Sequence, residues 1–313
     1  MPMLDSLKQI PRYAGRFIIA VIAGIILIYY PVGMLIVHHI DDSPTFNAEN
    51  HNADGGSHAV GMAIAMVERE VDSHRWVSSD PFFFPGAALI RMPAYQQGIM
   101  TSVTRFTTEL YDHIGRTRGS SQADKDLENA KGLFNYQPDV WLFDFKTSWW
   151  PTASSPTQYR KGVESLKTYN QRLKDGKATF ERRSDNLIET LERMASDLGS
   201  SSATIAKQIE SGSGLGFISS ASLYYNNKGR MAGTYWILRE LGKDYAVVLK
   251  ERQLDNAWNL MLLTLAEGMQ LDVFWPLNFA PDSQLLPNHL AAQGFYLMRA
   301  RTQMREITNI LLK

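Results

Sequence analysis

Three side chains that could bind a metal lie close together in the chain. His51, Asp54 and His58 stand in the order His-x2-Asp-x3-His. Imidazole and carboxylate groups are ligands of zinc and of related divalent cations. Their spacing matches no standard pair on one helix face, and the surrounding residues are rich in Asn, Asp, Gly and Ser. We therefore interpret the three residues as part of a solvated linker, with a metal site as the alternative.

Glu210 is the residue with the clearest possible catalytic role. It is followed by Ser211 and a Gly- and Ser-rich stretch, which faintly resembles the start of the catalytic segment of lytic transglycosylases. In such an enzyme one Glu with a raised pKa acts first as an acid and then as a base. Tyr224, Tyr225 and Tyr235 would then line a sugar groove. The expected Gly-Leu-Met-Gln run is missing after the Glu, so an exposed helix end is the simpler interpretation of Glu210.

Two aromatic clusters are candidates for binding a partner. Phe82, Phe83 and Phe84 lie between Pro81 and Pro85 in a segment with several helix breakers, and Trp149 and Trp150 precede Pro151. Three consecutive rings in such a loop cannot all point inward. One interpretation is that these residues contact a partner or the membrane. The other is that the loop crosses the helices as a lid and buries two of its three rings.

The composition excludes several classes of function. Lys and Arg together number 32 and are balanced by 32 Asp and Glu, so no surplus of positive charge indicates nucleic acid as a partner. The chain has no Cys, which excludes disulfides, thiol catalysis and Cys-ligated metals. No phosphate-binding or dinucleotide-binding motif occurs in the expected context, and we expect no cofactor.

One segment predicts a membrane location. The run from Phe17 to Val37 contains no charged residue, and a helix of that length crosses about 30 Å of hydrocarbon. Lys8, Arg12 and Arg16 precede this run and Asp41 and Asp42 follow it, which predicts a cytoplasmic N-terminus and a periplasmic main domain in the bacterial inner membrane. A cleaved signal peptide is the alternative, although its apolar core is normally shorter.

The predicted organisation has four parts and is mainly α-helical. Residues 1–16 form a cytoplasmic tail, 17–37 a transmembrane helix, 38–57 a flexible tether and 58–313 one helical-bundle-like domain. Apolar residues at helical spacing predict a long αα-hairpin over residues 155–199, with a turn at Gly176 and a stop at Gly199. Further helices are expected at 59–75, 99–114, 121–135, 203–211, 230–242, 247–270 and 288–312, and strand character only in pieces such as 140–145.

Several runs resemble a known family. They are Asp80-Pro-Phe-Phe-Phe-Pro85, Met92-Pro-Ala-Tyr-Gln-Gln-Gly98, Ile114-Gly-Arg-Thr-Arg-Gly-Ser-Ser121 and Arg182-Arg-Ser-Asp-Asn-Leu187. Together with Trp76 and the N-terminal apolar run, they resemble a family of proteobacterial inner-membrane proteins catalogued as domain of unknown function 2333. The resemblance supports the location and the fold. It implies no established activity and therefore no catalytic residues.

The sequence favours a function without catalysis. We expect a single-pass inner-membrane protein, anchored in the lipid bilayer through Phe17 to Val37, whose periplasmic domain serves as a scaffold or accessory subunit of an envelope complex. The alternative from another class is a peptidoglycan-acting lytic enzyme that uses Glu210. A further alternative is a lipid-handling domain, which needs an apolar cavity large enough for an acyl chain.

Overall fold

The computed structural model describes residues 3–48, 51, 55–115, 124–143, 149–211, 217–273, 276–279 and 287–313. Within these ranges the chain is almost entirely helical, and the one isolated β-bridge joins Asn278 and Asn288. The mainly α-helical prediction is confirmed. The helices are α1 (Met3–Val37), α2 (His58–Glu68), α3 (Arg91–Glu109), α4 (Lys125–Phe134), α5 (Ser155–Lys174), α6 (Ser184–Glu210), α7 (Phe217–Asp244), α8 (Ala246–Glu251), α9 (Asp255–Met269) and α10 (His289–Leu311).

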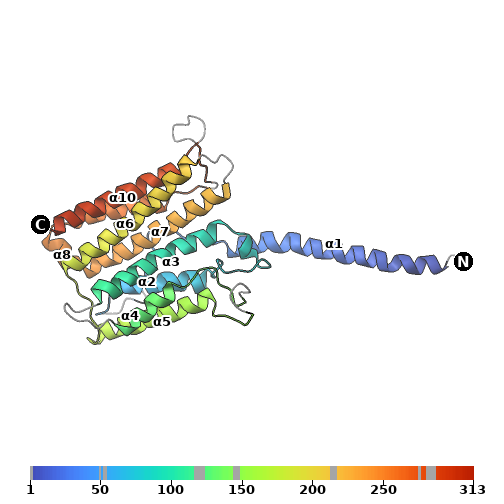
Figure 1. The fold of residues 1–313 in the computed structure, drawn as a ribbon, viewed down its shortest axis with the longest axis horizontal. Coiled ribbons are helices and arrows are strands. Elements are labelled where there is room, and N and C mark those ends of the chain that lie inside the picture. The colour runs from blue at the N-terminus through green and yellow to red at the C-terminus, as the bar shows by residue number, and fades with distance from the viewer. Residues whose placement is uncertain are drawn as a thin grey trace.

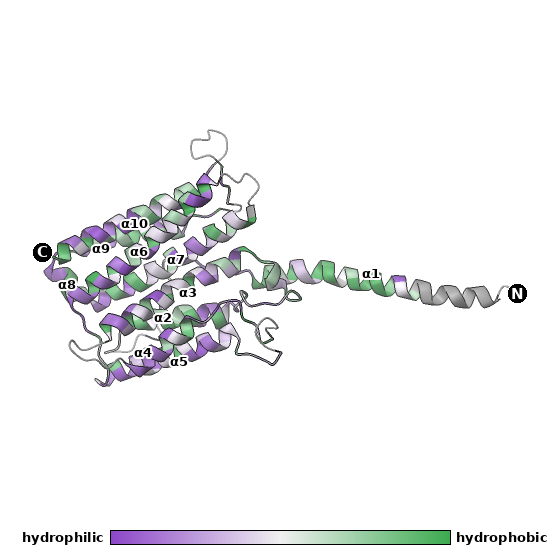
Figure 2. Cartoon of the chain, in the orientation of Figure 1, coloured by the Kyte–Doolittle hydropathy of each residue, from purple (hydrophilic) through white to green (hydrophobic). Residues whose placement is uncertain are grey.

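The helices of the domain lie side by side, and α1 projects away from one end of the array (Figure 1). Helix α7 packs on α3, α2 and α9, while α4 and α5 form one flank and α6 and α10 the other. Figure 2 shows green along much of the described part of α1, whereas the outer helices mix green and purple. Ala14–Val37 is the one stretch of the described chain that is long and apolar enough to span a membrane.

The central contact between α3 and α7 depends on glycine. A Cβ atom at Gly98 would lie 2.1 Å from the carbonyl oxygen of Asn226, and one at Gly229 would lie 2.1 Å from that of Tyr95. The two backbones therefore approach more closely than any larger residue permits at these positions. This contact fixes the relative positions of Tyr95 on α3 and the residues of α7 that form the site described below.

Polar caps and tight turns end the helices around the site. Ser57 caps the N-terminus of α2, and its side chain accepts a hydrogen bond from the Val60 amide. The Asp244 carboxylate accepts hydrogen bonds from the amides of His58 and Ala59. A negative group at a helix N-terminus is favourable because it satisfies amides that have no partner within the helix. The helix continues into a π-helical turn, η2 (Arg69–Ser73). A second π-helical turn, η4 (Leu110–Ile114), follows α3, and a short 3-10 turn, η3 (Pro85–Ala88), precedes it.

The structure differs from the predicted αα-hairpin. Both helices form and Gly176 adopts the expected positive φ of 68°, but α5 packs on α4 and α2 whereas α6 packs on α10. Gly199 does not end the return helix, because α6 continues to Glu210 and Gly199 lies against the Arg301 side chain of α10. Residues 140–143 form no strand, and positions 144 and 145 of that predicted strand lie outside the described residues.

The predicted tether also differs from the structure over the part that is described. Residues 38–48 lie against the domain, and Ala48 is buried in the same core as α2 and α7. Polar residues of this segment, which have the composition of a linker, are bonded to groups far away in the sequence. Trp236, for example, donates its indole hydrogen bond to the carbonyl oxygen of Ser43 at 3.1 Å.

Candidate functional site

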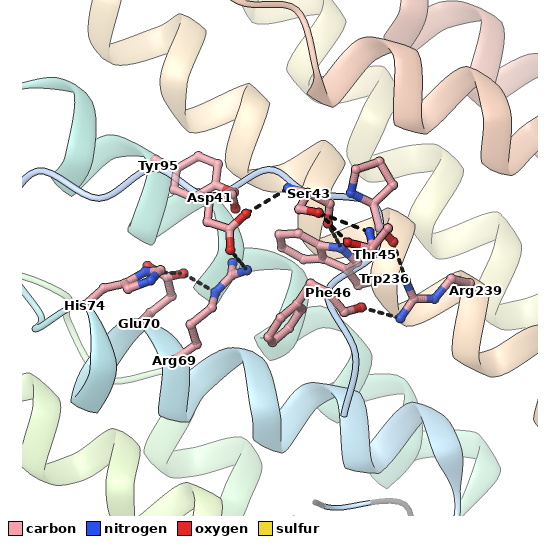
Figure 3. Close-up of polar contacts among 11 residues, drawn as sticks. Asp41, Ser43, Thr45, Phe46, Arg69, Glu70, His74, Tyr95, Trp236 and Arg239 are labelled. Carbon is pink, nitrogen blue, oxygen red and sulfur yellow. Dashed lines mark hydrogen bonds and ion pairs between the residues drawn. The ribbon is translucent and has the colours of Figure 1, made fainter. Parts of the chain in front are cut away.

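The junction between α1 and the domain contains a buried cation enclosed by aromatic rings. The Arg69 guanidinium lies 4.2 Å from the ring centre of Phe46 and 4.5 Å from that of Trp236 (Figure 3). Its Nε donates to Glu70 at 2.9 Å, and one terminal nitrogen lies 3.7 Å from an Asp41 carboxylate oxygen. Cation–π contacts stabilise most strongly when the cation is removed from water, as it is here.

Glu70 supplies the matching buried negative charge. It is fully buried, its Oε1 lies 3.6 Å from the His74 Nδ1, and its Oε2 makes no hydrogen bond. The π-helical turn η2 carries both Arg69 and Glu70 and widens the helix at this point, a local distortion that is frequent at functional sites. The turn that follows is held by the buried amide of Gln96, which donates to the carbonyl oxygens of Glu70 and Arg75.

Tyr95 joins this group from α3. Its hydroxyl donates to the carbonyl oxygen of Asp41 at 2.5 Å, and its side chain is fully buried. Burial raises the pKa of Tyr95 well above its ordinary value, an effect that the positive charge of Arg69 only partly opposes. The hydroxyl therefore stays protonated and remains a hydrogen-bond donor at physiological pH.

Helix α7 holds the segment that follows α1 at two further points. Arg239 donates to the carbonyl oxygens of Pro44 at 2.5 Å and Phe46 at 2.6 Å (Figure 3). Lys228 is only 3% exposed, and its Nζ lies 2.6 Å from the Asp42 carboxylate and donates to the carbonyl oxygen of Leu271. The carbonyl oxygens of Asp41, Ser43, Pro44 and Phe46 and the Asp42 carboxylate thus all have partners on the domain, as burial favours.

A pocket of about 640 Å³ opens beside these contacts. The His39 and His74 rings stack at 5.6 Å between centres, and Arg91 lies over the ring of Tyr225 at 5.6 Å. Burial lowers the pKa of His38, and the nearby positive charge of Arg91 lowers it further. The lining residues are His38, His39, Ile40, Asp41, Asp42, His74, Arg91, Tyr225, Lys228, Gln270 and Asp272.

This lining determines what the pocket can hold. It mixes imidazole, carboxylate, guanidinium and ammonium groups, which suits a polar ligand and does not suit an acyl chain. Among the described residues no group of three or more His, Asp or Glu side chains is placed to hold a metal ion. These residues stabilise the junction between α1 and the domain, and they offer a ligand both hydrogen-bond donors and hydrogen-bond acceptors.

The residues of the predicted metal site have other surroundings. His51 Nε2 lies 2.6 Å from the Glu68 carboxylate, and His58 occupies the first turn of α2. Asp54 lies outside the described residues. The two histidines are thus placed by contacts within the domain, and neither belongs to a group of described side chains with the composition of a metal site.

The residues of the predicted lytic site are not arranged as that chemistry requires. Glu210 is exposed at the end of α6, whereas the catalytic acid of such an enzyme lies in an apolar cleft. Tyr224 and Tyr225 are buried and donate to the carbonyl oxygens of Leu271 and Val273, and Tyr235 is partly buried beside Arg239. Tyr224 is a core residue, Tyr225 lines the pocket beside the junction, and Glu210 is not part of that lining.

The aromatic candidates are largely exposed. Phe82 is 84% and Phe83 43% exposed, so the loop does not bury two of its three rings. Phe84 is partly buried, with the Arg75 guanidinium over its ring at 4.9 Å. Trp149 and Trp150 are 85% and 80% exposed.

Sequence reasoning did not identify the junction cluster. Arg69 and Glu70 are charged residues of a kind that normally faces water, and only their burial distinguishes them.

Comparisons with known proteins place the chain in a family. No curated protein and no solved structure matches it. Residues 15–214 match the family described as an uncharacterized protein conserved in bacteria, DUF2333. This match includes the apolar segment of α1, the junction segment and the helices α2 to α6. The chain therefore belongs to this uncharacterized bacterial family, domain of unknown function 2333.

Proposed function

We propose that the chain is a single-pass protein of the bacterial inner membrane whose periplasmic helical domain serves as a non-enzymatic scaffold or accessory subunit of an envelope complex. The anchor is the apolar part of α1, in which Leu27 and Leu35 are 74% and 78% exposed and most apolar side chains are not covered by the domain. Side chains of this kind require a hydrocarbon environment. The basic residues before the span and the acidic residues after it favour a cytoplasmic N-terminus.

The observation that carries the proposal is the junction. The segment after α1 is bonded to the domain through Tyr95, Lys228 and Arg239, so the domain cannot move far from the membrane in which α1 lies. An enzyme that searches the cell wall gains from a long flexible tether. A subunit that presents a fixed surface to neighbours gains from the rigid attachment found here.

The location is tested by labelling single cysteines, because the natural chain has none. Ser6→Cys lies before the span and Val247→Cys lies on α8 at the far end of the domain. A membrane-impermeant maleimide applied to cells with a permeabilised outer membrane should label Val247→Cys, and should label Ser6→Cys only after lysis. The opposite pattern, or a mature chain that lacks the N-terminal segment, contradicts the proposal.

The scaffold role is tested by crosslinking in cells, followed by purification in mild detergent and mass spectrometry. The matched control is residues 1–48 fused to an unrelated reporter, which keeps the anchor and removes the domain. We expect a defined set of envelope proteins with the full chain and not with the control. Equal recovery with both proteins would show that the domain recruits nothing, and would contradict the role.

A further inference from the structure

A group of exposed apolar side chains lies in two loops of the domain. We call it the aromatic collar, and its members are Phe82, Phe83, Leu142, Phe143, Trp149 and Trp150. Their exposed fractions range from 39% for Phe143 to 85% for Trp149. The two loops contact each other, because the ring centre of Trp141 in the second loop lies 5.4 Å from that of Phe83 in the first. Within the second loop, the Thr152 amide donates to the carbonyl oxygen of Leu142. Several large apolar side chains exposed in two touching loops usually mark an interaction site.

The first of the two loops is placed against α1 by direct contacts. The Tyr30 hydroxyl donates to the carbonyl oxygen of Phe82 at 2.5 Å. Pro85 packs so closely on Gly33 that a Cβ atom there would lie 2.3 Å from the proline ring. Figure 1 shows the described parts of the loop between α4 and α5 at the end of the domain from which α1 leaves.

The length of the apolar span sets the depth of these contacts. Ala14–Val37 has 24 residues, which corresponds to about 36 Å of helix and exceeds a hydrocarbon core of about 30 Å. Tyr30 precedes the end of the span by seven residues, or about 10 Å along the helix. Measured along the helix, the loop that Tyr30 contacts therefore lies nearer the membrane centre than Val37, the C-terminal end of the apolar segment. This is the level at which the bilayer surface must lie.

The chemistry of the collar fits that level. Residues 81–90 contain no Asp, Glu, Lys or Arg, so the insertion of this loop removes no charge from water. The second loop has Asp144 and Lys146 between Phe143 and Trp149, and only its aromatic and aliphatic side chains are proposed to insert. Aromatic residues, and Trp above all, are favoured in the headgroup region of a membrane. The occupant that covers Phe82 and Phe83 is determined by position, because a bilayer at the level of Tyr30 is also at the level of the loop that Tyr30 contacts. The second loop contacts this loop through Trp141 and Phe83.

We propose that the aromatic collar inserts into the headgroup region of the same bilayer that α1 spans, so that the domain rests on the membrane through a second, loop-based attachment. This proposal rests on the membrane anchoring proposed above. It identifies lipid, and not another protein, as the partner of Phe82, Phe83, Trp149 and Trp150.

The test uses nitroxide labels on single cysteines in the full chain, reconstituted in nanodiscs of phosphatidylethanolamine and phosphatidylglycerol. Phe82→Cys and Trp149→Cys report on the collar. Leu27→Cys, within the span, is the reference for lipid, and Val247→Cys, which is 69% exposed on α8, is the reference for water. Accessibility to molecular oxygen, relative to a water-soluble nickel complex, measures the depth of each label.

We expect the labels at Phe82 and Trp149 to have ratios between those at Leu27 and Val247, clearly above the latter. If both collar labels match Val247 while Leu27 is in lipid, the collar proposal is wrong and the anchor stands. If Leu27 also matches Val247, the anchor itself fails, and the collar proposal fails with it.

A second measurement needs no label and guards against misfolded variants. Brominated lipids quench Trp fluorescence at short range, and Trp149 and Trp150 are far more exposed than the buried Trp76, Trp236 and Trp258. We expect quenching of the wild-type chain and a smaller quenched fraction in the Trp149→Phe, Trp150→Phe double variant. Equal quenched fractions would contradict insertion of this loop. Circular dichroism confirms that the double variant is folded.

Discussion

Arg69 and Glu70 are neighbours in the sequence that are both removed from water. Arg69 is 7% exposed and Glu70 is not exposed at all, and each offsets the charge of the other. Removing only one member of a buried pair leaves the other charge without compensation, which is far more costly than losing the pair's net attraction. The pair is therefore a sensitive point of the junction.

The first prediction concerns Arg69→Gln. We expect it to lower the free energy of unfolding by about 3–5 kcal/mol, since Glu70 would stay buried without its partner. Urea unfolding in detergent, followed by circular dichroism, measures the change. The control is Arg105→Gln, because Arg105 is half exposed in its pair with Asp197 and should cost about 0–1 kcal/mol. Similar losses for both variants would show that the burial of Arg69 has no energetic role.

The second prediction concerns pH. His289 accepts a hydrogen bond at Nδ1 from the Leu277 amide, and burial lowers the pKa of this imidazole from 6.5. Below pH 6.5 the unfolded chain binds the proton more readily than the folded chain, so the free energy of unfolding falls as the pH falls and is constant above that range for this group. Urea unfolding on both sides of pH 6.5 should show a smaller acid-dependent loss in His289→Gln than in wild type. An unchanged pH dependence would exclude His289 as a contributor.

At the scale of elements, the crossing of α3 and α7 gives the third prediction. Gly98→Ala places a methyl group against the α7 backbone and should destabilise the fold by about 1–3 kcal/mol or more, because neither helix can move without disturbing Tyr95 and Trp236. Gly132→Ala on α4 is the matched control. It has no atom within 4 Å of the new carbon and should stabilise by roughly 0.5–1 kcal/mol. Thermal unfolding distinguishes the two, and a stabilising Gly98→Ala would contradict the close approach.

Helical spacing of apolar residues predicted most of the elements, because the outer helices, such as α5 and α6, bury one face and the pattern records that face. It did not predict which helices pair. The faces of α5 and α6 satisfy the same periodicity whether they meet each other or meet α4 and α10, and only the three-dimensional arrangement decides. The junction was missed for a related reason. The polar composition of residues 38–57 predicts a linker, because the local sequence does not reveal the residues with which this segment forms hydrogen bonds. Trp236, for example, lies almost two hundred residues away from Ser43.

At the scale of the whole molecule, the fourth prediction concerns the attachment of the domain. Chymotrypsin should cleave slowly after Phe46 in the folded chain, because Arg239 holds the carbonyl oxygen of that residue. Arg239→Gln should accelerate this cleavage, whereas Arg160→Gln, in an exposed pair with Asp72, should not. Fragment analysis by mass spectrometry measures both rates. Rapid cleavage after Phe46 in wild type would restore the flexible-tether interpretation.

Residues 38–48 are packed on the domain and do not form a flexible linker, which has a mechanical consequence. Because the domain is held to the end of α1, the two rotate about the helix axis as one unit. The residue at which α1 ends therefore sets which face of the domain points toward a given neighbour. Adding one residue to α1 before Gly33 would rotate everything on its N-terminal side by about 100° relative to the domain. A sideways force on the end of the domain far from α1 would therefore tilt α1, with the contact between Gly33 and Pro85 as the pivot.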